Sequence, residues 1–239
     1  MICDTLLSIV SGGFGMLNGL KIAIDGPAAA GKSTIAKITA EKLAYTYIDT
    51  GAMYRALTYK AHKKGIELSD GKALSDLLAD SAILLVPKEN GQAVLLDGQD
   101  VSEAIRSEAV TSAVSEVAAH QEVRQLMVEK QRALGEKSGV VMDGRDIGTH
   151  VLPHAELKIF MTASVEERAL RRHMENKQRG IETPLNVLEK EIRDRDEADS
   201  NRKVSPLKQA EDAILLDTTS MTIEEVAAEI SRLAKERLA

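Results

Sequence analysis

The chain has 239 residues and a formal net charge of -6, and 44% of its residues are hydrophobic. This length and composition are typical of one large globular domain, or of one core with insertions. The acidic balance and the 3% content of aromatic residues argue against nucleic-acid binding, which relies on basic patches and stacking rings. The single cysteine, Cys3, excludes an intrachain disulfide and a four-cysteine zinc site, and it favours a reducing, cytoplasmic location.

The N-terminal residues 1–19 carry no pattern that indicates a binding or catalytic site. Their mildly apolar start lacks the basic region and cleavage site of a signal peptide. No apolar run in the chain approaches the roughly 20 residues of a membrane span, so we expect no membrane association. We expect residues 1–19 to be a disordered extension or a start-site artefact, with translation beginning at Met16. The remaining residues, 20–239, are expected to form a single domain.

A phosphate-binding pattern follows the first apolar strand candidate. Residues 26–33 match G-x-x-x-x-G-K-[ST] with no mismatch, and helical spacing begins at Ser33. Glycines let backbone N–H groups turn toward a polyphosphate, and the following helix adds the positive end of its dipole. In this pattern the Lys32 ammonium reaches the outer phosphates, and the Ser33 hydroxyl coordinates Mg²⁺. We therefore expect this loop to bind a polyphosphate.

The segments around this loop alternate between strand and helix. The strand candidates are 20–24, 45–48, 139–142, 156–161 and 213–216. The helix candidates are 33–43, 52–64, 101–137 in two pieces divided near His120, 164 through 171–173 toward a loop near Gly180, 183 to about 199, and 222 onward. Capping-box patterns begin at Ser164 and at Thr222. This alternation predicts an α/β fold with about five parallel strands flanked by helices in three layers.

Residues 66–110 interrupt the alternation. A short helix candidate at 74–78 precedes two β-like runs at 83–86 and 93–96, with Glu89-Asn90-Gly91 as the turn between them. We interpret this segment as a small antiparallel insertion within the α/β core. The basic stretch 171–180, which feeds a glycine loop, favours a mobile segment, and a solvated charged face is the alternative.

Three polar clusters are expected to meet where the parallel strands end. Ligands of open α/β sheets bind beyond the carboxyl ends of the strands, and these ends carry Gly26 onward, 49–51 and 143–146. Arg55 lies one helical turn after Gly51, and Arg145 directly follows a strand. Two guanidinium groups at one crevice suit a dianionic monophosphate, because their forks bind oxygens in pairs. A solvated helix face is the alternative for Arg55.

In order and combination, these motifs resemble those of bacterial-type cytidylate kinases, in the nucleoside monophosphate kinase group of P-loop proteins. The resemblance runs from Leu20 to the C-terminus and rests on four stretches, 24–33, 49–55, 143–149 and 193–202. It implies a P-loop kinase domain with its core at 20–50, 111–170 and 182–239, a small α+β monophosphate-binding insertion at 51–110 and a short lid at 171–181. It also implies ATP-dependent phosphorylation of CMP and dCMP with Mg²⁺. We expect a monomer, because no large exposed apolar helix face is evident.

The resemblance also assigns roles to individual residues. It implies ATP contacts from Gly26, Pro27, Ala28, Ala29, Ala30, Gly31, Lys32, Ser33 and Thr34. It implies CMP contacts from Thr50, Arg55, Ser115, Arg124, Arg145, Asp146, Arg195, Asp199 and Arg202. It implies catalytic roles for Lys32, Arg145, Arg171 and Arg172, with Arg179 on or beside the lid. Mg²⁺ is expected at Ser33, with Asp143 as its partner through water.

Individual residues at the expected site bear on backbone strain and on substrate preference. Ala28-Ala29 stands where Ser-Gly is more usual, so Ala29 must avoid a positive φ or accept strain. Thr50 stands where Ser is usual, which leaves the preference between CMP and dCMP open. The Asp146 carboxylate suits the exocyclic amine of cytosine, whereas uracil would place a carbonyl oxygen against it.

Several alternatives remain open at this point. Ser115 and Arg124 also fit surface positions on a long helix, and Asp143 also fits a structural role. Another kinase with the same loop, of the UMP/CMP or shikimate type, is the nearest enzymatic alternative, and a regulatory nucleotide-binding module is an alternative of another class. The arginine-rich second cluster favours a kinase. We assign no general base, because an acceptor phosphate is already ionised near neutral pH.

Overall fold

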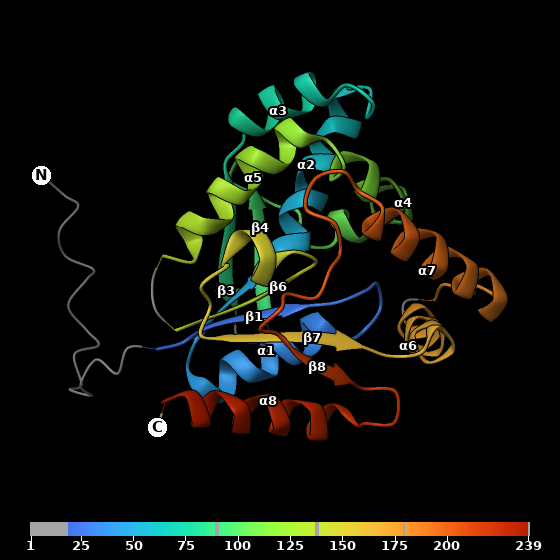
Figure 1. Ribbon diagram of the computed structural model, residues 1–239. Helices are drawn as coiled ribbons and strands as arrows, with labels where there is room; N and C mark the ends of the chain where they lie inside the picture. Colours follow the sequence, from blue (N-terminus) through green and yellow to red (C-terminus); the bar gives the residue numbers. More distant parts are fainter. Residues whose placement is uncertain (1–18, 89–90, 137–138, 179, 239) are drawn as a thin grey trace, which may run out of the picture.

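The computed structural model describes residues 19–88, 91–136, 139–178 and 180–238 (Figure 1). The expectations for residues 1–18, which include translation from Met16, lie outside these ranges. The same holds for residues 89–90 of the expected turn and for Arg179.

A parallel sheet forms the centre of the molecule and confirms the predicted α/β class. Its strand order is β2-β6-β1-β7-β8, with β1 (Lys21–Asp25), β2 (Thr46–Asp49), β6 (Val140–Gly144), β7 (Leu157–Thr162) and β8 (Ile214–Asp217). Each neighbouring pair in this five-stranded sheet is parallel. Strand β1 is the middle strand, so the loop after it opens at the centre of the carboxyl edge, where ligands of such sheets bind.

Helices cover both faces of this sheet, which explains why its central strands are apolar without alternation (Figure 1). On one face, α1 (Lys32–Leu43) and α8 (Ile223–Leu238) pack against the strands through residues such as Ile22 and Ile230. On the other face, Ala23 and Met142 pack in one cluster with Val151 of the π-helical turn η2 (Ile147–Val151). Successive residues of β1 therefore belong to opposite layers, as the alternation of side chains along a strand requires.

The predicted insertion forms a second, antiparallel sheet with its own core. Strands β3 (Ile83–Lys88), β4 (Gly91–Leu96) and β5 (Gln99–Asp100) follow that order in the sheet. Around them lie the helices α2 (Thr50–Lys64), α3 (Gly71–Ala79), η1 (Ala104–Arg106), α4 (Glu108–Val117) and α5 (Gln121–Leu134). The expected division of residues 101–137 near His120 is confirmed, whereas β5 is too short to give a periodic signal.

Helices α6 (Val165–Gln178) and α7 (Leu185–Ser200) pack against each other at one end of the sheet (Figure 1). Their contact includes the buried residues Ala169, Leu188 and Ile192, with Ala29 packed against the same cluster. Of the segment 171–181, expected to act as a lid, residues 171–178 form the second half of α6.

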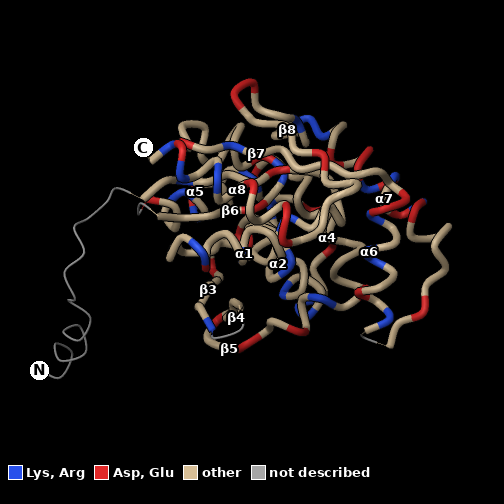
Figure 2. Tube along the Cα trace, turned by 90° about the horizontal axis from the view of Figure 1, so that it is seen from below, with Lys and Arg blue, Asp and Glu red and all other residues tan. Residues whose placement is uncertain are grey.

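Local capping explains where several helices begin. The Thr222 hydroxyl accepts from the Glu225 N–H at 3.2 Å, and the Glu225 carboxylate accepts from the Thr222 N–H at 2.8 Å, which confirms one capping box. The Asp49 carboxylate accepts from the Ala52 N–H at 2.8 Å and caps α2. Within the described ranges, the helices are too short or too polar to cross a bilayer. Figure 2 shows basic and acidic residues interspersed along the trace.

Candidate active site

The loop between β1 and α1 has the geometry of a phosphate cradle. Gly26 has φ 151°, and a Cβ at this position would lie 2.0 Å from the Met161 carbonyl oxygen, so only glycine fits. Gly31 directly precedes α1 with φ 83°. Below the loop, the Asp25 carboxylate accepts from the N–H groups of Ile147 and Gly148 at 2.8 and 2.7 Å. The start of the loop is therefore tied to η2, beyond the end of the neighbouring strand β6.

Lys32 places its charge inside this loop. Its ammonium is buried and donates to the Pro27 carbonyl at 2.6 Å. Burial, followed by the nearby Arg145 guanidinium, lowers the pKa of Lys32 well below its usual value of 10.5. Arg195 acts in the same direction, which places both arginines close enough for Lys32 to feel their charge. A polyanion bound here would reverse this effect, because negative charge favours the ammonium form.

Ala29 adopts the left-handed backbone conformation, which is costly for alanine. Its φ is 56°, in the left-handed region that favours glycine. The neighbouring Ala28 is held at both polar atoms: its N–H donates to Asp196 at 2.9 Å, and its carbonyl accepts from Arg168 at 3.0 Å. Sequence reasoning assigned no role to Arg168 or Asp196. One indication of such a role was available in the sequence: Arg168 directly precedes Ala169, which the helical pattern buries.

The Ser33 hydroxyl and the Asp143 carboxylate, the two expected Mg²⁺ partners, lie within hydrogen-bond distance of each other. Ser33 donates to Asp143 at 2.8 Å, and the Tyr47 hydroxyl donates to the other Asp143 oxygen at 2.8 Å. Burial and the nearby Asp49 carboxylate raise the pKa of Asp143 to about 6. Repulsion between two buried carboxylates is relieved by a cation, and Mg²⁺ prefers oxygen ligands, so this donor set fits Mg²⁺. In the described part of the chain, no group of three or more His, Cys, Asp or Glu side chains forms a cage for a metal.

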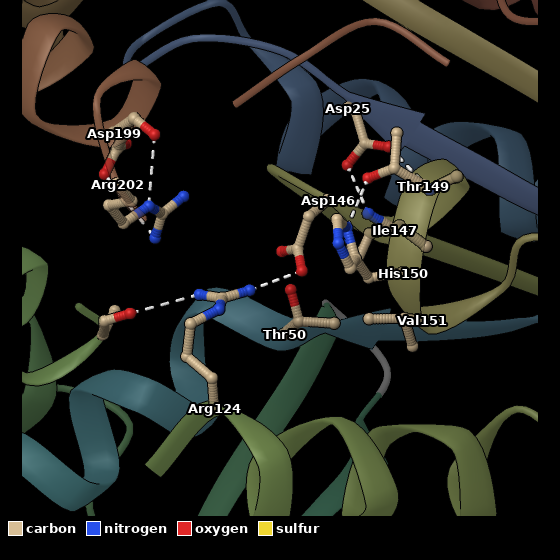
Figure 3. A network of polar contacts seen from close by, with 12 residues as sticks. Asp25, Thr50, Arg124, Asp146, Ile147, Thr149, His150, Val151, Asp199 and Arg202 are labelled. Carbon is tan, nitrogen blue, oxygen red and sulfur yellow. Dashed lines mark hydrogen bonds and ion pairs between the residues drawn. The ribbon is translucent and has the colours of Figure 1, made fainter. Parts of the chain in front are cut away.

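Arg124 and Asp146 form a buried ion pair beside the sheet edge (Figure 3). Arg124 is only 2% exposed, and it also donates to the Ala118 carbonyl at 3.2 Å and lies over the Tyr54 ring at 5.6 Å. The surface interpretation of Arg124 is therefore wrong. Thr50 also lies at this site, where its buried hydroxyl donates to the Asp143 carbonyl at 2.7 Å (Figure 3).

Further arginines gather around Asp49 and Asp199. Arg145 donates to Asp199 at 2.8 Å, and Arg202 donates to the Asp199 carbonyl at 3.1 Å. Arg55 donates to Asp49 at 3.0 Å, so it points back toward the strand end as its spacing predicted. Burial and the neighbouring Arg145 lower the pKa of Arg195 to about 10. We call this group the acceptor cluster, defined as Arg55, Arg124, Arg145, Asp146, Arg195, Asp199 and Arg202.

In the described structure, several arginine N–H groups of the acceptor cluster make no hydrogen bond. Among the described residues, arginine nitrogens that are buried without a hydrogen-bond partner are Arg55 Nε, Arg124 Nε, Arg195 Nε and Arg202 Nη2. The arginines also outnumber the carboxylates Asp49, Asp146 and Asp199 that face them. Buried donors without partners are costly, and a ligand with several anionic oxygens satisfies them.

The remaining expected site residues lie in different settings. Ser115 is half-buried on α4, and within the described ranges no polar contact connects it to the acceptor cluster. Arg171 donates to the Thr218 carbonyl at 2.7 Å, and Arg172 lies 3.5 Å from Glu175. A Cβ on Gly31 would lie 3.9 Å from Arg171, which places that arginine beside the phosphate cradle.

A parallel α/β sheet, a phosphate-binding loop at its central strand and a second anion-binding cluster define the class of P-loop kinases. The family model for cytidylate kinase matches residues 22–236. A curated cytidylate kinase from Geobacillus sp. (strain WCH70) is 60% identical over 223 residues, covering 93% of this chain and 100% of the relative. The cytidylate kinase of Bacillus subtilis (strain 168) is 56% identical over 218 residues, covering 91% of this chain and 97% of the relative. The chain belongs to the cytidylate kinase family.

Solved structures that match this chain do so at lower sequence identity. The shikimate kinase from Acinetobacter baumannii in complex with shikimate aligns with a TM-score of 0.45 at 15% identity, covering 91% of this chain and 94% of its own. The gluconokinase from Sinorhizobium meliloti 1021 aligns with a TM-score of 0.41 at 16% identity, covering 92% and 95%.

Proposed function

We propose that this protein transfers the terminal phosphoryl group of ATP to CMP and dCMP, giving ADP and the corresponding diphosphates. One observation carries the proposal: buried, unpartnered guanidinium nitrogens of Arg124 and Arg202 lie near the buried Asp146 carboxylate. A further one belongs to Arg195, which is within electrostatic range of Lys32. This combination matches a ligand with a phosphate dianion at one end and an amino-substituted base at the other. Family membership supports the same reaction.

The two groups of residues have separate tasks in the transfer. The bond between the terminal phosphorus and the ADP oxygen breaks, and an oxygen of the CMP phosphate forms the new bond. This reaction depends on alignment and charge stabilisation rather than on a protein nucleophile. We assign the ATP phosphates to Gly26–Thr34 with Lys32, and the CMP phosphate to Arg55 and Arg145. Arg171 and Arg172 would stabilise the charge that develops on the transferred group, which is worth roughly 10³- to 10⁵-fold in related arginine-assisted reactions.

The base is assigned to Asp146, Arg124, Ser115 and Arg202, and the sugar to Thr50, Arg195 and Asp199. A carboxylate accepts from the cytosine amine, and arginines donate to its ring acceptors. UMP would place a carbonyl oxygen against Asp146, leaving a buried polar mismatch. The Thr50 hydroxyl already donates to the Asp143 carbonyl, so it retains acceptor capacity toward a sugar hydroxyl.

Mg²⁺ is part of the proposal as the partner of ATP. Ser33 would bind it directly and Asp143 through water, and the ion would neutralise phosphate charge. We also propose that 51–110 binds the monophosphate, that 171–181 acts as the lid and that 20–50, 111–170 and 182–239 form the core. We also propose that the enzyme is monomeric and cytoplasmic.

The proposal is tested by coupling ADP release to NADH oxidation with purified protein, ATP and one acceptor at a time. The acceptors are CMP, dCMP, UMP, AMP and shikimate. We expect CMP and dCMP to accelerate ADP release well beyond UMP, AMP and shikimate. Equal rates with and without CMP would refute the proposed function and favour a nucleotide-binding module.

A further inference from the structure

We propose that Arg168 and Asp196 are positioning residues that set the phosphate-binding loop through Ala28 and tie it to helix α7. This inference rests on the proposed function, because it concerns how the same loop and acceptor cluster are held together. Neither residue is among those expected to touch either substrate.

The contacts form a closed network around one residue of the loop. The Ala28 N–H donates to one oxygen of Asp196 at 2.9 Å, and Arg168 donates to the Ala28 carbonyl at 3.0 Å. Arg168 also pairs with the second oxygen of Asp196. The Nε of Arg168 donates to the Ala163 carbonyl at 2.9 Å, which fixes the guanidinium against the end of β7. The pair thus holds Ala28 at both its donor and its acceptor.

Fixing the Ala28 carbonyl also fixes the next N–H. A trans peptide is planar, so the N–H of Ala29 points away from the Ala28 carbonyl and therefore away from Arg168. In the described part of the chain, the Ala29 N–H has no hydrogen-bond acceptor. The left-handed φ of 56° at Ala29 is costly for alanine, and it persists only where surrounding contacts impose it. The Arg168–Asp196 pair supplies those contacts and leaves this N–H available to a phosphate oxygen.

The same helix faces the acceptor side of the site. Asp196 lies directly after Arg195 and one turn before Asp199, which pairs with Arg145 at 2.8 Å. A displacement of α7 would therefore act on the phosphate-binding loop through Asp196 and on the acceptor cluster through Arg195 and Asp199. We infer that this connection makes the affinities for ATP and CMP depend on each other, which requires reciprocal coupling.

The test uses full-length protein and variants that remove one or more contacts of the Arg168–Asp196 pair. Asp196→Asn keeps an oxygen for the Ala28 N–H and loses the ion pair, whereas Asp196→Ala loses both. The double variant Arg168→Met/Asp196→Ala avoids a buried unpaired guanidinium, and it replaces the single variants if they fail to fold. The matched control is Asp194→Ala, on the same helix, because Asp194 is exposed and pairs only with Lys190 at 2.7 Å in the described structure.

Calorimetric titration measures ATP affinity alone, CMP affinity alone, and CMP affinity with a non-hydrolysable ATP analogue. We expect Asp196→Ala to weaken ATP binding roughly 10-fold, Asp196→Asn to weaken it less and Asp194→Ala to leave it unchanged. We expect the analogue to strengthen CMP binding in the wild type and to lose most of that effect in Asp196→Ala. Unchanged ATP affinity in Asp196→Ala, or an unchanged effect of the analogue, would overturn the inference. The titration with ATP alone needs no CMP, so failure of the wild type to bind CMP would refute the proposed function and leave this test intact.

Discussion

At the scale of single residues, the site depends on buried charges that hold each other in place. Arg124 and Asp146 illustrate this, because each would be costly in the core without the other. Their side chains are aligned before any base arrives, so little side-chain ordering remains to be paid on binding. We assign the distinction between cytosine and uracil to this pair.

The variant Asp146→Asn tests that assignment. Asparagine keeps the shape, loses the charge and adds a donor that suits the uracil carbonyl. We expect kcat/KM for CMP to fall roughly 10- to 100-fold and the ratio of CMP to UMP use to fall with it, while KM for ATP changes little. Steady-state kinetics with each acceptor measure this. The control is Asp212→Asn, on the surface, where the carboxylate pairs with Lys158 at 2.8 Å. Equal losses for ATP and CMP would contradict the role of Asp146.

Asp25 predicts a pH dependence of stability. Burial raises the pKa of Asp25 from 3.8 to about 7, despite the hydrogen bonds from the Gly148 and Ile147 backbone. Between about pH 4 and pH 7, the folded state therefore holds a proton at Asp25 that the unfolded state has lost. The stabilisation that this proton provides is full at about pH 4 and is lost as the pH rises to about 7. We expect the free energy of unfolding of the wild type, measured relative to Asp25→Asn by urea titration, to fall by a few kcal/mol over this range. A constant difference between the two proteins would contradict the shift.

At the scale of elements, the phosphate-binding loop combines a required glycine with an unfavourable alanine. Gly26 is forced by the Met161 carbonyl, whereas Ala29 packs against the Ala169 cluster and accepts a left-handed backbone. The same conformation occurs at Ala44, which ends α1 with φ 56° outside the loop. The two alanines therefore provide a matched pair of substitutions.

We expect Ala29→Gly and Ala44→Gly each to raise the free energy of unfolding by about 0.5–1 kcal/mol. The left-handed penalty of about 1–2 kcal/mol is removed, and the greater freedom of glycine in the unfolded chain returns part of that gain. Thermal or urea unfolding measures both variants. A loss of stability in either would show that the backbone conformation there carries no strain.

The capping box at the start of α8 gives a further prediction. Thr222→Ala removes the hydroxyl that accepts from the Glu225 N–H, and helix caps of this type are worth about 1 kcal/mol. We expect a loss of that size in urea unfolding with unchanged kinetics, because α8 covers the face of the sheet opposite η2. A change in KM for either substrate would show that α8 influences the site.

Sequence patterns predicted the elements because local signals and burial agree there. Apolar runs marked the five parallel strands, and the capping-box pattern at Thr222 marked the start of α8. The π-helical turn at Ile147–Val151 was not predicted, since it depends on Asp25 accepting from two of its N–H groups across the sheet. Arg168 was missed for the same reason: its partners on Ala28 and Asp196 are remote in the sequence. The roles of individual site residues stay predictions.

At the scale of the whole molecule, the fold brings a donor loop and an acceptor cluster to one edge of the sheet. The loop follows the middle strand β1, and Arg145 follows the neighbouring strand β6. Helix α2 supplies Arg55, α5 supplies Arg124, and α7 supplies Arg195 and Asp199. These separate segments must therefore stay in register for phosphoryl transfer, which is why a connection such as Arg168–Asp196 has a function.

The most direct test of the account is competition between two acceptors in one sample. Equal concentrations of CMP and UMP are incubated with ATP, Mg²⁺ and the enzyme, and anion-exchange chromatography of timed samples separates and quantifies CDP, UDP and ADP. The ratio of the initial rates gives the ratio of kcat/KM directly. The account predicts that CDP forms at least about tenfold faster than UDP, since only cytosine satisfies Asp146. Formation of UDP at the rate of CDP, or release of ADP with inorganic phosphate and no CDP, would contradict it.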